Sequence, residues 1–175
     1  FRPCDVHATT HCWRMAMENM ETPTALIFSR QNIKDLPSGT DYESGVRRGA
    51  YEVVHEANPD VVLVASGSEV STLAETAALL ANDGIKARVV SCPSEGLFRR
   101  QPKEYQESLL PTDFPIFGLT AGLPITFEGL VGNKGKVHGL ESFGFSAPYK
   151  VLDEKLGYTA ENIYREVKEY LGGLA

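Results

Sequence analysis

The chain has 175 residues, which is about the length of one domain. Hydrophobic residues make up 42% and charged residues 23%, a balance that excludes a largely disordered chain. The formal net charge of −6 lacks the basic surplus of proteins that bind phosphate backbones, so we expect no nucleic-acid partner. No apolar run approaches the ~20 residues that span a bilayer, so we expect no membrane partner either. The chain opens at Phe1 with neither a signal peptide nor a start methionine, and we expect a piece of a longer protein.

The three cysteines do not form a disulfide framework, because their number is odd and their spacing is irregular. A reducing, cytoplasmic setting is therefore expected. Cys4, His7, His11 and Cys12 lie close together, and the two histidines would share one face of a helix, as metal-binding pairs do. However, the cysteines form no CxxC pair, and no glutamate stands between the histidines to act as a base. We therefore favour an amphipathic helix with exposed histidines and predict no metal site.

The N-terminal part of the sequence predicts a helix, a strand and a linker. Residues 9–19 carry an apolar stripe at helical spacing. Residues 24–28 form a continuous apolar run between Pro23 and a polar stretch, which predicts a fully buried strand. Residues 34–48 contain glycine and proline without any periodicity, which is typical of a linker between two folded bodies. We therefore place a domain boundary near residue 45.

Beyond this boundary, predicted strands and helices alternate. Residues 50–54 and the apolar run 61–65 each predict a strand. A helix should open at Ser66-Gly67-Ser68 and end at Asp83-Gly84, because the apolar residues between these points repeat at helical spacing. Residues 86–92 predict the next strand. A strand, a helix and a strand within about thirty residues form a βαβ unit, whose crossover should be right-handed.

The remaining residues continue this alternation. Glycines are dense between residues 118 and 144, but apolar residues separate them, which indicates tight turns in a folded region. We predict strands at residues 115–119 and 136–140, and helices at residues 103–110, 148–156 and from Thr159 onward. The pattern predicts an α/β fold, a three-layer α/β/α sandwich with a mostly parallel sheet of about five strands. A short helix–strand remnant of another α/β domain is expected to precede it.

Two segments are candidates for ligand binding. Arg30 follows the strand predicted at residues 24–28, and ligands of α/β sheets bind beyond the carboxyl ends of strands. Its guanidinium suits phosphate or carboxylate, although a structural carboxylate could also hold it. Ser66-Gly67-Ser68 opens a helix, where free N–H groups favour anions, but a capped helix start is the simpler explanation. His55 and His138 are isolated and no GxSxG nucleophile motif occurs, so we predict no catalytic residue in this chain.

Several blocks of sequence follow one another in order along almost the whole chain. The first is Arg2-Pro3, and the second, residues 23–32, contains the motif Ser29-Arg30-Gln31-Asn32. The others are residues 58–70 (NPDVVLVASGSEV), 84–93 (GIKARVVSCP), 104–111 (EYQESLLP), 142–148 (SFGFSAP) and 154–163 (EKLGYTAENI). Each block alone is weak, whereas the ordered set is specific. In this order the chain resembles the C-terminal part of a transketolase.

The resemblance implies a transferase of the pentose phosphate pathway that moves a two-carbon ketol unit from a ketose phosphate to an aldose phosphate. In this family thiamine diphosphate, anchored by a divalent metal such as Mg²⁺, carries the chemistry. The cofactor lies at the interface of a homodimer and in upstream domains, so the resemblance implies no cofactor-binding, metal-binding or catalytic residue in this chain. Residues 1–45 resemble the end of the pyrimidine-binding domain plus a linker, and residues 46–175 resemble the C-terminal domain.

By the same resemblance, Arg30 binds the phosphate of the sugar-phosphate substrate, and the chain alone should be inactive without the upstream domains. The chain departs from the family pattern at residues 120–127, where transketolases usually have a Glu-Ala-Gly stretch followed by a tryptophan-containing helix. Two alternatives stay open. One is a related thiamine-diphosphate enzyme, of the dihydroxyacetone synthase or dehydrogenase E1 type. The other is a non-catalytic assembly module that binds a small anion at Ser66-Gly67-Ser68.

Overall fold

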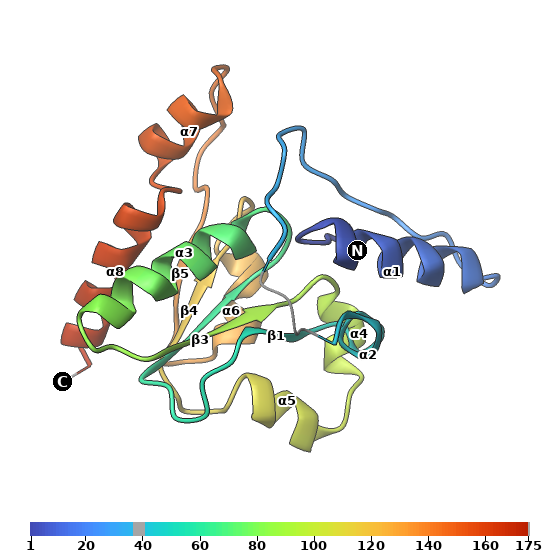
Figure 1. Cartoon of the computed structure of the whole chain (residues 1–175), viewed down its shortest axis with the longest axis horizontal. Helices are drawn as coiled ribbons and strands as arrows, with labels where there is room; N and C mark the ends of the chain where they lie inside the picture. Colours follow the sequence, from blue (N-terminus) through green and yellow to red (C-terminus); the bar gives the residue numbers. More distant parts are fainter. Residues whose placement is uncertain (37–40, 175) are drawn as a thin grey trace.

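The computed structural model describes residues 1–36 and 41–174. These residues contain a five-stranded sheet in the order β1-β3-β2-β4-β5, with helices packed on both of its faces (Figure 1). The strands from β3 to β5 run parallel to one another, whereas β1 at the edge is antiparallel to β3. The strands are β1 (Tyr51–Val54), β2 (Val61–Ala65), β3 (Ala87–Ser91), β4 (Ile116–Leu119) and β5 (Lys136–His138).

The helices divide into two layers. Residues of α1, α3 and α8 share one core cluster with the sheet, and residues of α4, α5 and α6 share the other. The helices are α1 (Val6–Glu18), α2 (Tyr42–Arg48), α3 (Glu69–Asn82), α4 (Glu95–Arg99), α5 (Lys103–Leu109), α6 (Ile125–Val131), α7 (Tyr149–Leu156) and α8 (Ala160–Gly172). The predicted three-layer α/β/α sandwich with a mostly parallel sheet is thereby confirmed.

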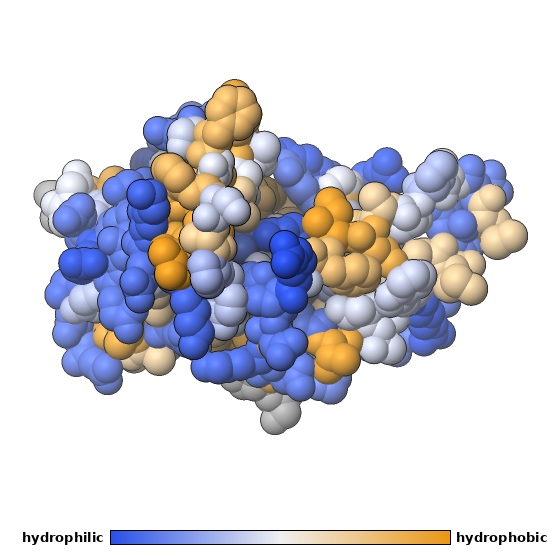
Figure 2. All heavy atoms as spheres, turned by 90° about the horizontal axis from the view of Figure 1, so that it is seen from above, coloured by the Kyte–Doolittle hydropathy of each residue, from blue (hydrophilic) through white to orange (hydrophobic). Residues whose placement is uncertain are grey.

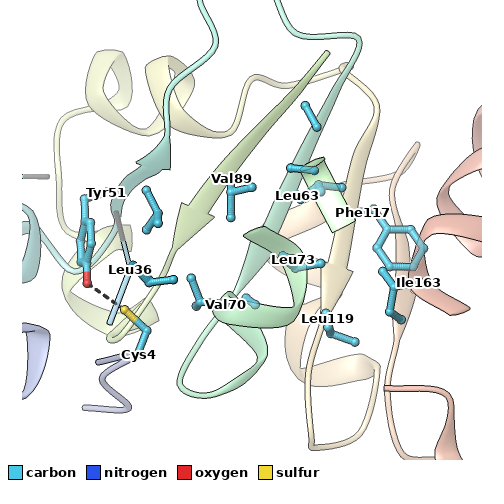
Figure 3. Close-up of a cluster of buried hydrophobic side chains, with 14 of the residues drawn as sticks. Cys4, Leu36, Tyr51, Leu63, Val70, Leu73, Val89, Phe117, Leu119 and Ile163 are labelled. Atoms are coloured by element: carbon cyan, nitrogen blue, oxygen red, sulfur yellow. Dashed lines mark hydrogen bonds between the residues drawn. The ribbon is translucent and has the colours of Figure 1, made fainter. Parts of the chain in front are cut away.

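The central strands are buried on both faces, which explains their continuous apolar sequence. Every residue of β2 is buried. Val61, Leu63 and Ala65 enter the cluster under α3 and α8, part of which Figure 3 shows. Val62 and Val64 enter the cluster under α4, α5 and α6. Because successive side chains of a strand point to opposite faces, a strand of this composition requires a helical layer on each side.

The predicted alternation of elements is confirmed from residue 50 onward. The strand at residues 61–65 has the predicted bounds, and β2, α3 and β3 form the predicted unit with parallel neighbouring strands. The other predicted strands and helices of this region differ from the observed ones by a few residues at their ends. The short helices α4 and α6 were not predicted. The helix α6 directly follows Pro124, and its first three residues lie in the stretch that departs from the transketolase pattern.

The buried strand predicted at residues 24–28 is wrong. The segment joins no sheet within the described residues, and Ile27 and Phe28 are 58% and 50% exposed. Two hydrogen bonds connect it to the first residue: the N-terminal ammonium of Phe1 donates to Ala25 O at 2.7 Å, and Ile27 N donates to Phe1 O at 2.9 Å. Burial of a strand requires paired strands beside it and covering layers above and below. The described residues supply neither at this place.

The linker predicted at residues 34–48 is also partly wrong, because it contains α2. The Asp41 side chain caps this helix by accepting from Ser44 N at 3.1 Å, and Gly49 ends it with a φ of 86°. Residues 37–40 of the predicted linker lie outside the described residues. The boundary near residue 45 falls within α2, and the division into residues 1–45 and 46–175 stays a prediction.

The N-terminal segment packs directly against the sheet. The Asp5 carboxylate caps α1 by accepting a backbone N–H at 2.8 Å, so this helix begins before the predicted residue 9. Asp5 Oδ2 also accepts from the Tyr42 hydroxyl of α2 at 2.6 Å. Cys4 is fully buried in the core cluster, with its Sγ 3.4 Å from the Tyr51 hydroxyl of β1 (Figure 3). These contacts join α1, α2 and the edge strand into one packed unit.

Arg88 carries a nearly buried charge on β3, with its side chain 11% exposed. The guanidinium donates to the carbonyl oxygens of Glu56 and Ser108 at 2.8 to 3.1 Å and pairs with the Glu52 carboxylate at 3.2 Å. A buried charge is tolerated only when such partners replace water. Arg88 therefore joins β1, the loop that follows it and α5 across the end of the sheet.

We predict that Gly49→Ala destabilises the chain more than Gly84→Ala does. Both glycines have a positive φ, of 86° and 77°, so each alanine should cost about 1 kcal/mol in backbone strain. A Cβ at Gly49 would also lie 2.4 Å from Ser94 O and 2.5 Å from Phe98 N, whereas a Cβ at Gly84 meets nothing within 4 Å. Urea unfolding should show a loss for Gly49→Ala at least about 2 kcal/mol larger. Equal losses would mean that the Ser94–Phe98 backbone gives way freely.

We predict that Arg88→Met lowers the free energy of unfolding by about 2–4 kcal/mol, because it leaves two carbonyls and a carboxylate without their donor. Arg99→Met is the matched control, since Arg99 is exposed and its ion pair among residues 1–36 and 41–174 is with Glu95, one helix turn away. That control should lose no more than about 0.5 kcal/mol. Urea titration of both variants checks the difference, and a small loss for Arg88→Met would contradict the buried network.

Candidate functional site

Arg30 lies just beyond the extended segment 24–28, at a bend without regular secondary structure. It is exposed, and within residues 1–36 and 41–174 its guanidinium forms no hydrogen bond or ion pair. Beside it, the Ser29 hydroxyl donates to the carbonyl of Gln31 at 3.2 Å, which closes the bend around Arg30. In the described part of the chain, no structural carboxylate holds Arg30. Its five donors are therefore available to an anion from outside.

A cleft of about 420 Å³ lies beside this bend. One wall comes from Ser29 and residues 31–34, and the others come from the first turns of α3 and from α7. Ser29, Gln31 and Asn32 line the cleft, whereas Arg30 does not. The structure thus separates the members of the Ser-Arg-Gln-Asn motif. The arginine is presented outside the cleft, and its neighbours face into it.

The N-terminus of α3, the second candidate, already holds an anion that belongs to the chain. Glu69 lies in the first turn of this helix, with its side chain 10% exposed. Its carboxylate accepts from the Ser68 hydroxyl at 2.8 Å and forms an ion pair with Arg2. Arg2 Nη1 also donates to the carbonyl oxygen of Ser66 at 2.5 Å. Because a carboxylate occupies the favourable position at the helix start, this geometry argues against a small-anion site at Ser66-Gly67-Ser68.

The interior of the cleft disfavours additional negative charge. Burial, with the Glu69 carboxylate as a smaller contribution, raises the pKa of Asp153 above its ordinary value. Burial and the same carboxylate raise the pKa of Tyr158 to about 12, so this hydroxyl stays protonated at neutral pH. It donates to the carbonyl oxygen of Thr120 at 2.7 Å. Lys34, an exposed cation that lines the cleft, lies 3.3 Å from the Glu75 carboxylate. The arrangement supports the packing of α7 better than the binding of a phosphate.

The cysteine–histidine cluster does not assemble into a metal site. Cys4 and Cys12 are fully buried within the core, and burial raises the pKa of their thiols to about 11 and about 12. His7 instead lies against the ring of Tyr42, with 5.4 Å between the centroids. Among the described residues, no group of three potential ligands lies close enough to hold a metal ion. The amphipathic helix favoured from the sequence is what α1 forms.

His138 is not isolated, as the sequence suggested, but forms a pair with Glu166 of α8. Its Nδ1 lies 3.0 Å from Glu166 Oε1, and its Nε2 lies 3.0 Å from the carbonyl oxygen of Leu156. Asn162 Nδ2 donates to the same Glu166 oxygen at 2.8 Å. Since both ring nitrogens are engaged, this pair holds the junction of α7 and α8 rather than offering an acid or a base. Helical spacing places Asn162 and Glu166 on one face, but nothing in the sequence indicates that His138 faces them.

Large apolar side chains are exposed in two areas of one face of the molecule, which Figure 2 shows. One area lies over α1 and the extended segment after it, and the other lies over α7 and the segment before it. Their members are Trp13, Met17, Met20, Ile27 and Phe28 in the first area, and Phe143, Phe145, Tyr149 and Val151 in the second. Exposed apolar surface of this kind marks places where another protein part packs. In the described residues, no helix is both long and apolar enough to cross a membrane.

Comparison with known proteins supplies the context for these features. A family model described as the transketolase-like C-terminal domain matches residues 49–159. Transketolase 2 of Vibrio parahaemolyticus is 38% identical over 173 residues, which cover 98% of this chain and 26% of that protein. A transketolase of Staphylococcus aureus is 41% identical over 169 residues, which cover 95% of this chain and 26% of that protein.

Solved structures give the same result. The transketolase from Leishmania mexicana superposes with a TM-score of 0.90 at 37% identity, over 98% of this chain and 25% of that chain. The transketolase from Campylobacter jejuni superposes with a TM-score of 0.85 at 33% identity, over 97% of this chain and 26% of that chain. This chain therefore spans about a quarter of the length of the transketolases that it matches. The family model and the structural match together show that the chain belongs to the transketolase C-terminal domain family.

Proposed function

We propose that this chain is the C-terminal part of a transketolase that transfers a two-carbon ketol unit between sugar phosphates. The support is its similarity to transketolases over nearly all of its own length. One such relative, from Pichia stipitis, has been solved in complex with sedoheptulose-7-phosphate, at 29% identity and a TM-score of 0.89. The proposal includes a cytoplasmic homodimer of the pentose phosphate pathway. The free thiols of Cys4, Cys12 and Cys92 suit a reducing compartment.

Thiamine diphosphate and a divalent metal such as Mg²⁺ supply the carbanion chemistry in this proposal. The residues that the structure describes do not fit such a site. A diphosphate and its metal need a cluster of carboxylate or other oxygen ligands together with cationic or N–H donors. Among the described residues no cluster of metal ligands occurs, and the Arg2 charge at the cleft is taken up by Glu69. The cofactor would therefore be bound by residues upstream of this chain.

The part played by this chain is to present Arg30 to the substrate. The single observation that carries this proposal is an exposed arginine without a partner in the described residues, at a bend whose sequence matches the transketolase motif. A guanidinium binds a phosphate through two parallel N–H bonds, which fixes the position of the sugar as well as its charge. Arg30 would then select for phosphorylated sugars at the tail of the substrate, away from the reacting carbons.

We predict that the isolated chain has no ketol-transfer activity, even with thiamine diphosphate and Mg²⁺ added. The reason is that its residues do not fit a cofactor site. A coupled assay of ketol transfer from a ketose phosphate to an aldose phosphate measures this, with a full-length transketolase under identical conditions as the control. Turnover by the isolated chain at a rate near that of the control would refute the proposal that residues upstream of this chain bind the cofactor.

We predict that Arg30→Ala in the full-length enzyme weakens the use of phosphorylated substrates by roughly 1.5–3 kcal/mol, the value of a charge-assisted hydrogen bond. This corresponds to about a 10- to 150-fold fall in kcat/KM. A substrate of the same class without phosphate should change little. Arg100→Ala, which removes an exposed charge on the other side of the sheet, is the matched control. Equal losses for the phosphorylated and unphosphorylated substrates would remove the phosphate-binding role.

A further inference from the structure

We infer that His138 is a pH-sensitive switch at the junction of α7 and α8: the doubly protonated imidazole holds the two helices together, and the loss of one proton weakens that hold. His138 is the last residue of β5, and its side chain is 14% exposed. The inference is independent of the proposed function, because it concerns contacts within the folded chain and not the substrate.

Both partners of the imidazole ring are hydrogen-bond acceptors. Nε2 lies 3.0 Å from the carbonyl oxygen of Leu156, and Nδ1 lies 3.0 and 3.1 Å from the two carboxylate oxygens of Glu166. Neither a carbonyl oxygen nor an ionised carboxylate has a proton to donate. A neutral imidazole carries a single N–H, so it serves one partner and turns a lone pair toward the other. The imidazolium has an N–H on each nitrogen and satisfies both partners at once.

The end of α7 also favours a positive charge at this position. Leu156 is the last residue of α7, where the helix dipole is negative and the carbonyl groups lack an intrahelical donor. Gly157 follows with a φ of 80°, and a Cβ there would lie 3.0 Å from His138 Cε1. The backbone of this turn therefore approaches the ring closely, and the imidazolium caps the helix.

The acceptor on α8 is held in place from the same helix. Asn162 Nδ2 donates to Glu166 Oε1 at 2.8 Å and to the carbonyl oxygen of Gly157 at 3.0 Å. When His138 loses a proton, a ring lone pair faces either this carboxylate or the carbonyl at the end of α7, and one of the two bonds is broken. Because α7 forms a wall of the cleft, the attachment of that wall then depends on pH.

Other titratable or charged groups belong to the elements around the ring. The Tyr158 ring lies edge-on at 4.9 Å between centroids, and its hydroxyl stays protonated because its pKa is raised to about 12. Lys136 points to the same face of β5 as His138, whereas the adjacent β4 carries no titratable residue. Arg165 of α8 donates to Asn162 Oδ1 at 3.4 Å. Burial raises the pKa of Asp153, one turn before the end of α7, toward the range in which a histidine titrates, so a control variant must separate these two groups.

Hydrogen exchange of the full-length enzyme, followed by mass spectrometry at about pH 6 and about pH 9, tests the switch. The readout is the protection of residues 156–163, corrected for the intrinsic effect of pH and compared with that of β2, whose buried amides report global opening. We expect protection at the junction to fall about 10-fold as the pH rises, because a contact that needs the protonated ring is lost on deprotonation. Asp153→Asn should show the same fall.

Two variants separate the charge of His138 from its packing. His138→Gln has its donors on one nitrogen and cannot reach both partners, so its junction at pH 6 should be as weakly protected as that of the wild type at pH 9. Glu166→Gln can donate an amide N–H to Nδ1 of the neutral ring, while Nε2 still donates to Leu156, so its junction should stay protected at both pH values.

Three results would overturn the inference: a wild type whose protection does not change with pH, a Glu166→Gln variant with the same fall as the wild type, or loss of the fall in Asp153→Asn. If His138→Gln does not fold, the wild type, Glu166→Gln and Asp153→Asn still decide the outcome.

Discussion

The burial of the central strands on both faces is the constraint from which the rest of this structure follows. The side chains of β2 alternate between two apolar clusters, so neither face can be left to water. Helices must therefore cover both sides, and parallel neighbours require long crossovers such as α3 between β2 and β3. The carboxyl ends of these rigid strands then supply fixed carbonyl and N–H groups at one edge. The N-terminal segment is attached to these groups.

The same constraint explains what the sequence predicted well. A strand buried on both faces requires a continuous apolar run, and residues 61–65 were therefore predicted with correct bounds. The segment at residues 24–28 has the same kind of run, yet it is exposed. An apolar run shows what a segment needs in order to be buried, but not whether the strands that would bury it lie in the same chain. The sequence also did not predict that β1 runs antiparallel to β3. The direction of a strand depends on how the strands are connected and not on their local pattern.

The structure also differs from the sequence-based predictions at α2 and around Arg30. The helix α2 had a capping aspartate, Asp41, and a terminal Gly49 in plain sequence, but the surrounding glycine and proline suggested a linker. The sequence predicted Arg30 after a buried strand, whereas the structure places it after an exposed extended segment. The contacts of Arg2 join residues 64 and 67 positions apart, Ser66 and Glu69. No local motif shows that the helix start at Ser68 is filled by the side chain of Glu69.

The place where an α/β fold usually binds a ligand is filled in this structure. Adjacent strands β2 and β4 lead into α3 and α6 on opposite faces of the sheet, so the crevice beyond their ends is the place where α/β folds usually bind ligands. Here that crevice contains parts of the protein itself. Arg2 donates to the carbonyl oxygen of Ser66 just past the end of β2, and the Tyr158 hydroxyl donates to the carbonyl oxygen of Thr120 just past the end of β4. The usual ligand position is thereby filled by contacts within the chain.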